Sequence, residues 1–122
     1  MSLSEGRAPE SVALVDIAID SWRFARLFAR LIAKLDAGEQ ARYESQLRWY
    51  LKRLEEQLDA TGLKIVNIEG QAFDAGVAAT PLNAGDFSAE DVLYVDQMLE
   101  PIIMGPAGLV RAGTVLLRKL ER

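Results

Sequence analysis

The stretch Leu58-Asp59-Ala60-Thr61-Gly62-Leu63-Lys64-Ile65-Val66 divides the chain into two parts of different character. The 53 residues from Pro9 to Thr61 contain a single Gly and no Pro after Pro9, which is typical of helices. From Gly62 onward, seven Gly and three Pro separate short apolar runs, which favours strands and turns. We therefore predict an α+β protein, with a flexible tail over 1–8, a helical hairpin over 9–61 and a small β-subdomain over 62–122.

The first helix of the hairpin is predicted from Pro9 or Ser11 to about Asp36, because Pro and an acidic residue suit a first turn. Its apolar residues form two neighbouring stripes. One has a/d spacing and comprises Leu14, Ile17, Ser21, Phe24, Phe28, Leu31 and Leu35; the other comprises Val15, Ala18, Trp22, Ala25, Ala29 and Ile32. One antiparallel neighbour cannot cover both stripes, so we expect this helix to lie deep in a bundle.

The second helix is predicted from about Glu39 to Ala60, after a short break at Asp36-Ala37-Gly38. Gly62 suits the left-handed conformation that ends a helix, and the short break requires antiparallel helices. Because two helices make a poor core, we predict a homodimer in which two hairpins form a four-helix bundle. The expected dimer interface comprises Leu14, Ile17, Phe24, Phe28, Leu31, Leu47, Tyr50 and Leu54.

The second part is predicted to contain mainly short strands. We expect a strand from Leu63 to Ile68, a loop over 76–86, an apolar run over 102–104 and a β-turn at Gly105-Pro106-Ala107-Gly108. A last strand is expected from Leu109 to Leu120, with Gly113 as a bulge or a point of close approach. The segment over 88–100 fits a helix with a capping box at its start, and it fits a strand equally well.

Composition excludes several classes of chemistry. The 122 residues include no Cys and no His, so disulfides, thiolate zinc sites, Cys nucleophiles and the commonest general base are absent. The net charge of −4 disfavours generic nucleic-acid binding, and no apolar run reaches the length of a membrane span. The first residues lack the features of a secretory signal. We expect a cytoplasmic, non-enzymatic binding protein with no cofactor, no metal, no nucleic-acid partner and no membrane partner.

A pair of carboxylates in the first helix could act as acid and base or hold a divalent ion. Asp16 and Asp20 are one helical turn apart, but Arg23 and Arg26 lie nearby, so a solvated, ion-paired face is the expectation. Residues 65–110 contain seven acidic side chains and no Lys or Arg. That stretch is either a docking surface for a basic partner or simply a soluble acidic face.

Four stretches resemble the motifs of a known family in their order and spacing. They are Ile19 to Ala25, Leu47 to Leu58 followed by Gly62-Leu63, Ile68-Glu69-Gly70-Gln71-Ala72-Phe73-Asp74, and Leu109 to Val115. Together they resemble the GrpE family of nucleotide-exchange cochaperones over about residues 14–118. The chain looks like a divergent member that lacks the long N-terminal coiled-coil stalk.

The resemblance implies a steric mechanism without covalent chemistry. A GrpE-like protein binds the ATPase domain of a DnaK-type chaperone and promotes ADP release by stabilising the open nucleotide cleft. Matching the family motifs implies partner-binding roles for Gly70, Phe73, Asp74 and Arg111. Met104 and Leu109 flank the predicted turn and are added as plausible contacts. The resemblance also implies that Val92 to Leu99 form a strand.

Two alternatives remain open from the sequence. The first is a dimeric interaction module on the same scaffold without exchange activity, because Gly108 lies near the position where many family members carry a basic residue. The second is an enzyme that uses carboxylates such as Asp16 and Asp20 around a metal ion.

Overall fold

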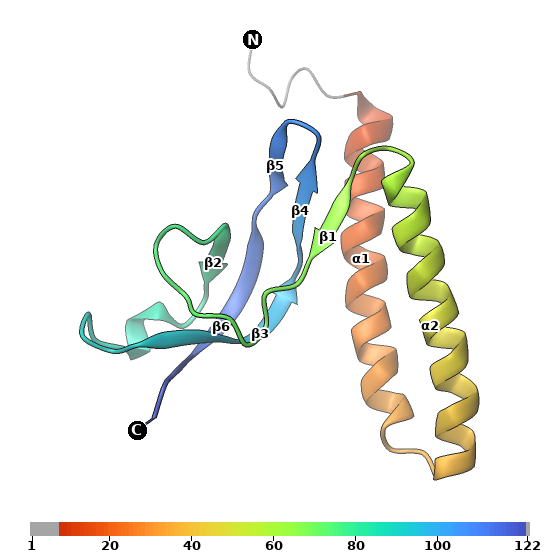
Figure 1. Ribbon diagram of the computed structural model, residues 1–122, viewed down its shortest axis with the longest axis horizontal. Helices are drawn as coiled ribbons and strands as arrows, with labels where there is room; N and C mark the ends of the chain where they lie inside the picture. Colours follow the sequence, from red (N-terminus) through yellow and green to blue (C-terminus); the bar gives the residue numbers. More distant parts are fainter. Residues whose placement is uncertain (1–7, 122) are drawn as a thin grey trace. The chain divides into compact units, whose positions relative to one another are not determined.

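The structure is a computed structural model that describes residues 8–121. The chain divides at Thr61 and Gly62 into a helical unit and a β unit, each compact in itself (Figure 1). The predicted α+β class is therefore confirmed, and the boundary lies at the predicted glycine. Of the predicted tail over 1–8, residues 1–7 lie outside the described residues. In chain order the elements are α1 (Pro9–Ile32), α2 (Ala37–Asp59), β1 (Lys64–Val66), β2 (Ala79–Pro81), η1 (Ala84–Asp86), β3 (Leu93–Glu100), β4 (Ile102–Gly105), β5 (Gly108–Arg111) and β6 (Gly113–Lys119).

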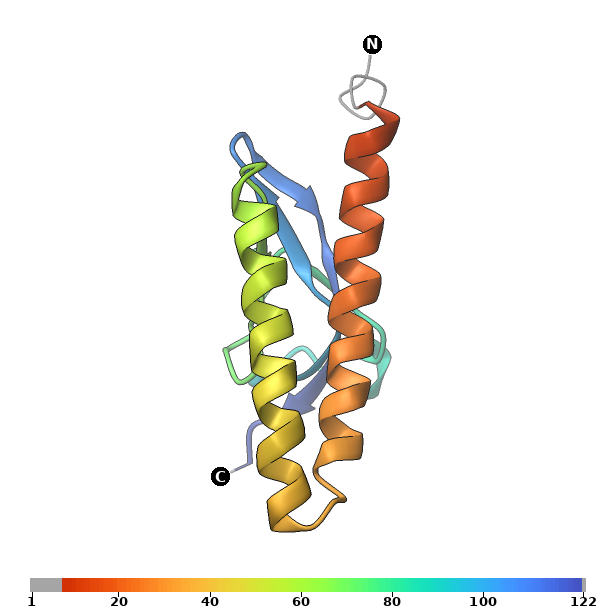
Figure 2. The ribbon, with the colours of Figure 1, turned by 90° about the vertical axis from the view of Figure 1, so that its right-hand side faces the viewer.

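The helical unit is an antiparallel hairpin of α1 and α2, joined by a short turn (Figure 2). Helix α1 begins at Pro9 as predicted but ends at Ile32, four residues before the predicted end. The difference arises at Asp36, whose Oδ1 accepts a hydrogen bond from the Glu39 amide at 3.0 Å. Asp36 is therefore the N-cap of α2 and cannot also continue α1. Helix α2 begins correspondingly earlier than predicted.

The end of α2 agrees with the prediction. The Leu58 carbonyl in the last turn accepts hydrogen bonds from both the hydroxyl and the amide of Thr61, at 2.8 and 2.9 Å. Gly62 follows with φ of 78°, the left-handed conformation expected for a helix stop. The chain then enters β1, which is shorter than the strand predicted from Leu63 to Ile68.

The β unit contains two sheets of three strands each. One has the order β1-β4-β5 and is antiparallel; the other has the order β2-β6-β3, with β2 parallel and β3 antiparallel to β6. Leu93 to Glu100 form β3, which resolves the open choice between helix and strand in favour of a strand. Ser88 and Asp91 do make a local bond, from the Ser88 amide to Asp91 Oδ2 at 2.9 Å, but it closes a turn before the strand.

The strand predicted from Leu109 to Leu120 is divided in two. Its first part, β5, pairs with β4 in one sheet, whereas β6 lies at the centre of the other sheet. The division falls just before Gly113, where a Cβ atom would lie 2.9 Å from the Glu100 carbonyl oxygen. The predicted close approach at Gly113 is therefore confirmed, and it coincides with the change of sheet.

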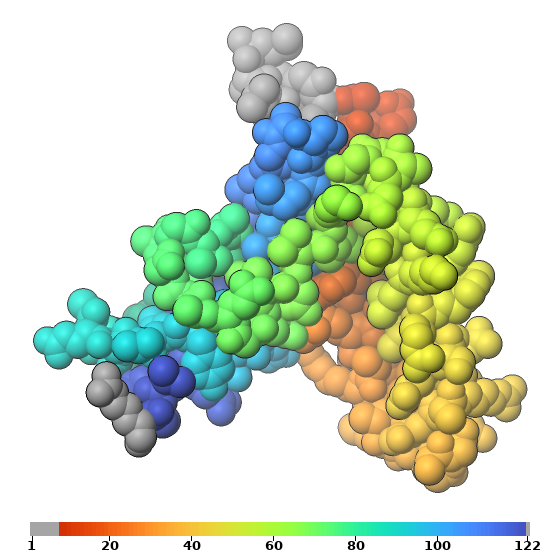
Figure 3. Space-filling view, viewed as in Figure 1, coloured from red at the N-terminus to blue at the C-terminus, as the bar shows by residue number. Residues whose placement is uncertain are grey.

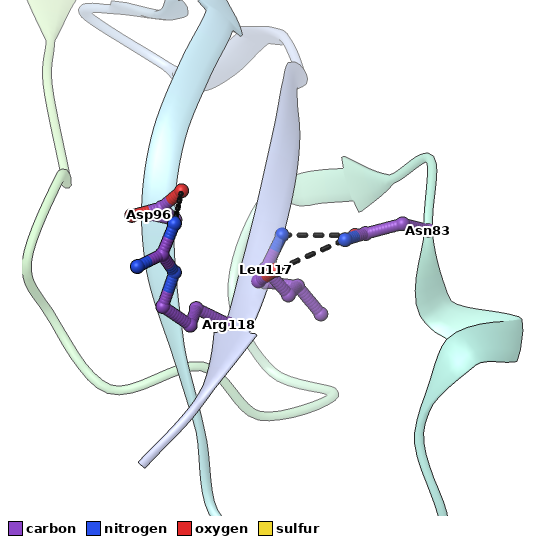
Figure 4. A network of polar contacts seen from close by, with 4 residues as sticks. All are labelled: Asn83, Asp96, Leu117 and Arg118. Carbon is purple, nitrogen blue, oxygen red and sulfur yellow. Dashed lines mark hydrogen bonds and ion pairs between the residues drawn. The ribbon is translucent and has the colours of Figure 1, made fainter. Parts of the chain in front are cut away.

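The loop predicted over 76–86 contains two short elements, β2 and η1. Strand β2 is held beside β6 by register pairs that end at Pro81 and Val115. Asn83 extends this pairing through its side-chain amide, which bonds to both backbone polar groups of Leu117 (Figure 4). The Asn83 side chain thus takes the place of a strand residue in hydrogen bonding to β6. The sequence pattern did not indicate this interaction.

The core of the β unit includes large side chains that are almost fully buried in β3, β4 and β6. They are Val95, Met98, Ile103, Val115 and Leu117. Polar groups at the edge of β3 are also paired, because the Met98 amide donates to Glu69 Oε2 at 2.7 Å. Within residues 8–121, no helix has the length and apolar character needed to cross a membrane.

Candidate partner-binding surfaces

The first group of predicted partner residues lies in the loop after β1, along the edge of β3. Gly70 has φ of 85°, and its amide donates to the Val95 carbonyl at 2.8 Å. The Phe73 amide donates to the Leu93 carbonyl at 3.0 Å, and the Phe73 ring is half-buried. The loop therefore runs beside β3 like an irregular extra strand, and its glycine permits the turn into that position.

Asp74 closes the same loop with its own side chain. Its Oδ1 accepts a hydrogen bond from the Gly76 amide at 2.8 Å, and its carbonyl accepts from the Val77 amide at 3.1 Å. This is an Asx-type turn, in which one carboxylate oxygen replaces a backbone acceptor. Asp74 is exposed, so a partner can reach its carboxylate, but one oxygen of that carboxylate already holds the turn.

The second group lies on the β4–β5 hairpin of the other sheet. Met104 and Leu109 are register partners across the two strands, and Arg111 is the register partner of Ile103. Leu109 is 52% exposed, Met104 is half-buried and Arg111 is exposed. The turn between the strands occupies Gly105 to Gly108, as predicted. Leu109 and Met104 therefore provide an apolar pair on this β-hairpin.

The six predicted partner residues thus occupy two separate sheets. Gly70, Phe73 and Asp74 lie beside β3, and Met104, Leu109 and Arg111 belong to the hairpin. They therefore form two groups, one beside β3 and one on the β4–β5 hairpin. Of these, the hairpin has the large exposed apolar side chain that a protein interface needs.

The two apolar stripes of α1 differ sharply in exposure. Five of the six residues of the second stripe are buried: Val15, Ala18, Trp22, Ala25 and Ile32. The a/d stripe is largely open, because Ile17, Phe24 and Leu31 are 58%, 65% and 58% exposed. Leu14 and Phe28 are half-buried. The chain by itself therefore covers one stripe and leaves the other in water, where large apolar side chains are unfavourable.

Helix α2 continues this open surface. A groove of about 240 Å³ is lined by Phe24, Ala25, Phe28, Leu47 and Tyr50. The Phe28 ring packs edge-on against Tyr43, with ring centroids 6.5 Å apart. Leu47 is half-buried and Tyr50 is 38% exposed, whereas Leu54 is buried within the chain. Seven of the eight predicted interface residues thus keep at least part of their surface free.

Sequence reasoning missed a second hollow, in the β unit. It measures about 540 Å³ and lies where β3 begins and β6 ends; its lining is Gly70, Ala72, Val92, Leu93, Tyr94, Arg118, Lys119, Leu120 and Glu121. Val92 and Leu120 are more than half exposed there, and the Leu120 amide donates to the Val92 carbonyl. Ion pairs from Arg118 to Asp96, at 3.4 Å, and from Lys119 to Asp91, at 3.7 Å, flank it. The sequence signal that could have indicated this hollow is the pair of apolar residues at the strand ends, Val92 and Leu120.

The remaining polar chemistry is at the surface. Among residues 8–121, no charged or polar side chain is buried, and no three carboxylates gather as a metal site would require. What the described surfaces offer is apolar contact and exposed charge. No family model, no curated protein and no solved structure matches this chain. Function is therefore inferred from motif order and surface geometry.

Proposed function

We propose that this chain is a GrpE-like cochaperone that binds the ATPase domain of a DnaK-type chaperone and promotes ADP release. The observation that carries the proposal is the order of the four motif stretches on the elements. The first lies in α1 and the second in α2. The third forms the loop beside β3, and the fourth runs through β5 into β6. A helical hairpin, a glycine stop and a compact β unit are what the resemblance implies.

A second copy of the chain is the proposed cover for the open stripe of α1. Ile17, Phe24 and Leu31 are each more than half exposed, and the groove between α1 and α2 continues the same surface. Burying each such side chain contributes about 1.5–3 kcal/mol, and a symmetric dimer buries every one twice. That gain offsets the loss of translational and rotational freedom on association. Two hairpins then form the four-helix bundle.

The β4–β5 hairpin is the proposed contact with the chaperone. Leu109 and Met104 supply an apolar pair, and Arg111 adds an exposed cation on the same strand as Leu109. Binding accelerates ADP release only if the open form of the ATPase domain is bound more tightly than the closed form. The mechanism needs no cofactor, no nucleic acid and no membrane, and in this proposal the protein works in the cytoplasm.

Stopped-flow release of fluorescent ADP from a DnaK-type ATPase of the same organism tests the proposal. We expect the release rate to rise and then saturate as the protein is added. An unchanged rate with every such ATPase of that organism would remove the proposal. Bovine serum albumin at the same concentration serves as the control for nonspecific effects.

The alternative is a dimeric interaction module on this scaffold without exchange activity. Gly108 favours it, because φ there is 119°, a conformation that side-chain-bearing residues rarely adopt. The turn is thus built around glycine near the position where many GrpE-like proteins carry a basic residue. Tight binding to the ATPase domain without faster ADP release would favour this alternative.

A further inference from the structure

Charge is distributed unevenly between the parts of the chain. Residues 23–53, which form most of the hairpin, carry eight basic and three acidic side chains. Residues 62–121 carry four basic and eight acidic side chains. The rest of the hairpin, residues 9–22 and 54–61, carries six acidic side chains and no Lys or Arg, so the positive charge is concentrated in this one segment.

The basic residues of α2 surround an exposed tryptophan. Trp49 follows Arg42 by seven residues and precedes Arg53 by four, so the three lie on one side of the helix, with Lys52 beside them. Trp49 is 62% exposed, which is unusual for the largest apolar side chain. We call Arg42, Trp49, Lys52 and Arg53 the α2 outer face. In the space-filling view the side chains of α2, coloured from gold to yellow-green, form an uneven surface (Figure 3).

The cations of this face are available for a ligand. In the part of the chain that the structure describes, the side chains of Lys52 and Arg53 form no ion pair or hydrogen bond. Arg42 lies over the neighbouring Tyr43 ring, with its Cζ atom 5.5 Å from the ring centroid, and has no carboxylate partner among the described residues. Three cations within about 16 Å along a helix produce a local positive potential, which the single carboxylate on the same side, Glu56, reduces but does not cancel.

The α2 outer face is distinct from the proposed dimer interface. Neither Trp49 nor the three cations line the groove formed by Phe24, Phe28, Leu47 and Tyr50. On the helical wheel Trp49 lies well away from the buried Leu54 and Leu58. A dimer that covers the groove therefore leaves Trp49 without a partner.

We propose that the α2 outer face binds an acidic polypeptide segment that carries apolar side chains. Carboxylates satisfy exposed Arg and Lys side chains with charge-assisted hydrogen bonds, and an apolar side chain covers Trp49. A single-stranded nucleic acid fits less well, because its binding relies on several aromatic platforms and this face has one. A bilayer fits less well too, because one apolar residue gives little insertion.

Fluorescence anisotropy with labelled probes tests this inference on the full chain. The probes are a short amphipathic peptide of Glu and Leu, the same peptide with Ser in place of Leu, a single-stranded DNA oligonucleotide, and phosphatidylserine vesicles followed by co-sedimentation. We expect the Glu–Leu peptide to bind most tightly, and its affinity to fall as NaCl is raised. Equal affinity for the Ser peptide, or tighter binding of the oligonucleotide or the vesicles, would overturn the proposal.

Two variants locate the binding. Trp49→Ala and the double variant Arg42→Glu with Arg53→Glu should each weaken binding of the Glu–Leu peptide by about tenfold or more. The control is Arg118→Glu with Lys119→Glu, which changes the net charge equally in the β unit and should leave the affinity unchanged. Circular dichroism checks that every variant is folded. Peptide affinity that survives in both α2 variants, or is lost equally in the control, would show that this face is not the site.

Discussion

The side-chain amide of Asn83 and the backbone of Leu117 form two reciprocal hydrogen bonds (Figure 4). Asn83 Nδ2 donates to the Leu117 carbonyl at 3.0 Å, and Asn83 Oδ1 accepts from the Leu117 amide at 2.9 Å. The pairing continues the β2–β6 ladder beyond Pro81. One polar side chain therefore fixes the loop before β3 to the central strand of its sheet.

Replacing Asn83 by Ala should destabilise the protein, because it leaves two half-buried backbone groups of β6 without their partner. We expect the free energy of unfolding to fall by about 1–3 kcal/mol in urea titrations. Asn67→Ala is the matched control, since Asn67 makes one exposed bond, to the Glu69 amide. Equal stability of the two variants would contradict this account of Asn83.

Gly113→Ala should also be destabilising, for a steric reason. The added Cβ would lie 2.9 Å from both the Glu100 carbonyl oxygen and Met98 Cε, so β3 and β6 would have to move apart. We expect a loss of about 1–3 kcal/mol, the usual cost of overpacking. Gly85→Ala, where the new Cβ has no neighbour within 4 Å, should change stability little. An unchanged free energy of unfolding for Gly113→Ala would contradict this, because it would show that a Cβ fits between β3 and β6 at this position.

Phe24→Asp separates dimer formation from folding of the hairpin. Phe24 is 65% exposed in the single chain, so the variant should fold, while two buried carboxylates per dimer would prevent association. Light scattering should give twice 13.5 kDa for the wild type and 13.5 kDa for the variant. Trp49→Asp, at a position equally exposed but outside the groove, should remain dimeric. A wild type of 13.5 kDa at micromolar concentration would exclude the dimer.

Phe28→Asp should be more harmful than Phe24→Asp, because Phe28 is half-buried and packs against Tyr43 within one hairpin. An unpaired carboxylate at that position disrupts the contact between the helices themselves. We expect a lower melting temperature by circular dichroism. An NMR spectrum as dispersed as that of the wild type would show that Phe28 is not part of the seam.

Leu109→Asp should weaken binding to the chaperone by about tenfold or more without affecting stability, because Leu109 is the exposed apolar residue of the hairpin. Isothermal titration calorimetry with the ATPase domain measures the effect. Leu82→Asp, directly after β2 and 63% exposed, is the control. Equal weakening by both variants would place the contact elsewhere.

The sequence predicts the hairpin followed by the β unit, and it fails for short elements and where single side chains decide the backbone path. Glycine content and helical spacing identified the hairpin and its end at Gly62, because both depend on local backbone preference. The end of α1 was placed too late, because Asp36 suits either helix until its cap on Glu39 is seen. Strand β2 has no signal in the sequence, because three residues are too few for a periodic pattern and their pairing with β6 is long-range.

For the candidate sites, the sequence identified the residues that share a helical face but not how the strands are grouped into sheets. The spacing of Ile17, Phe24 and Leu31 identified a stripe that is exposed in the single chain, since helical periodicity fixes which residues share a face. Motif order named residues 70–74 and the hairpin as partner residues, but it did not show that they lie beside different sheets. The separation arises because β5 and β6, which follow each other in the chain, belong to different sheets. That difference depends on long-range strand pairing.

Thermodynamic linkage gives the most direct test of the proposed cochaperone function. The measurement is the affinity of this protein for the ATPase domain of the DnaK-type chaperone, once free of nucleotide and once saturated with ADP. We predict tighter binding to the nucleotide-free domain, by the same factor by which the protein weakens ADP binding. Equal affinity for the two forms would contradict the account, because such a protein cannot promote ADP release however tightly it binds.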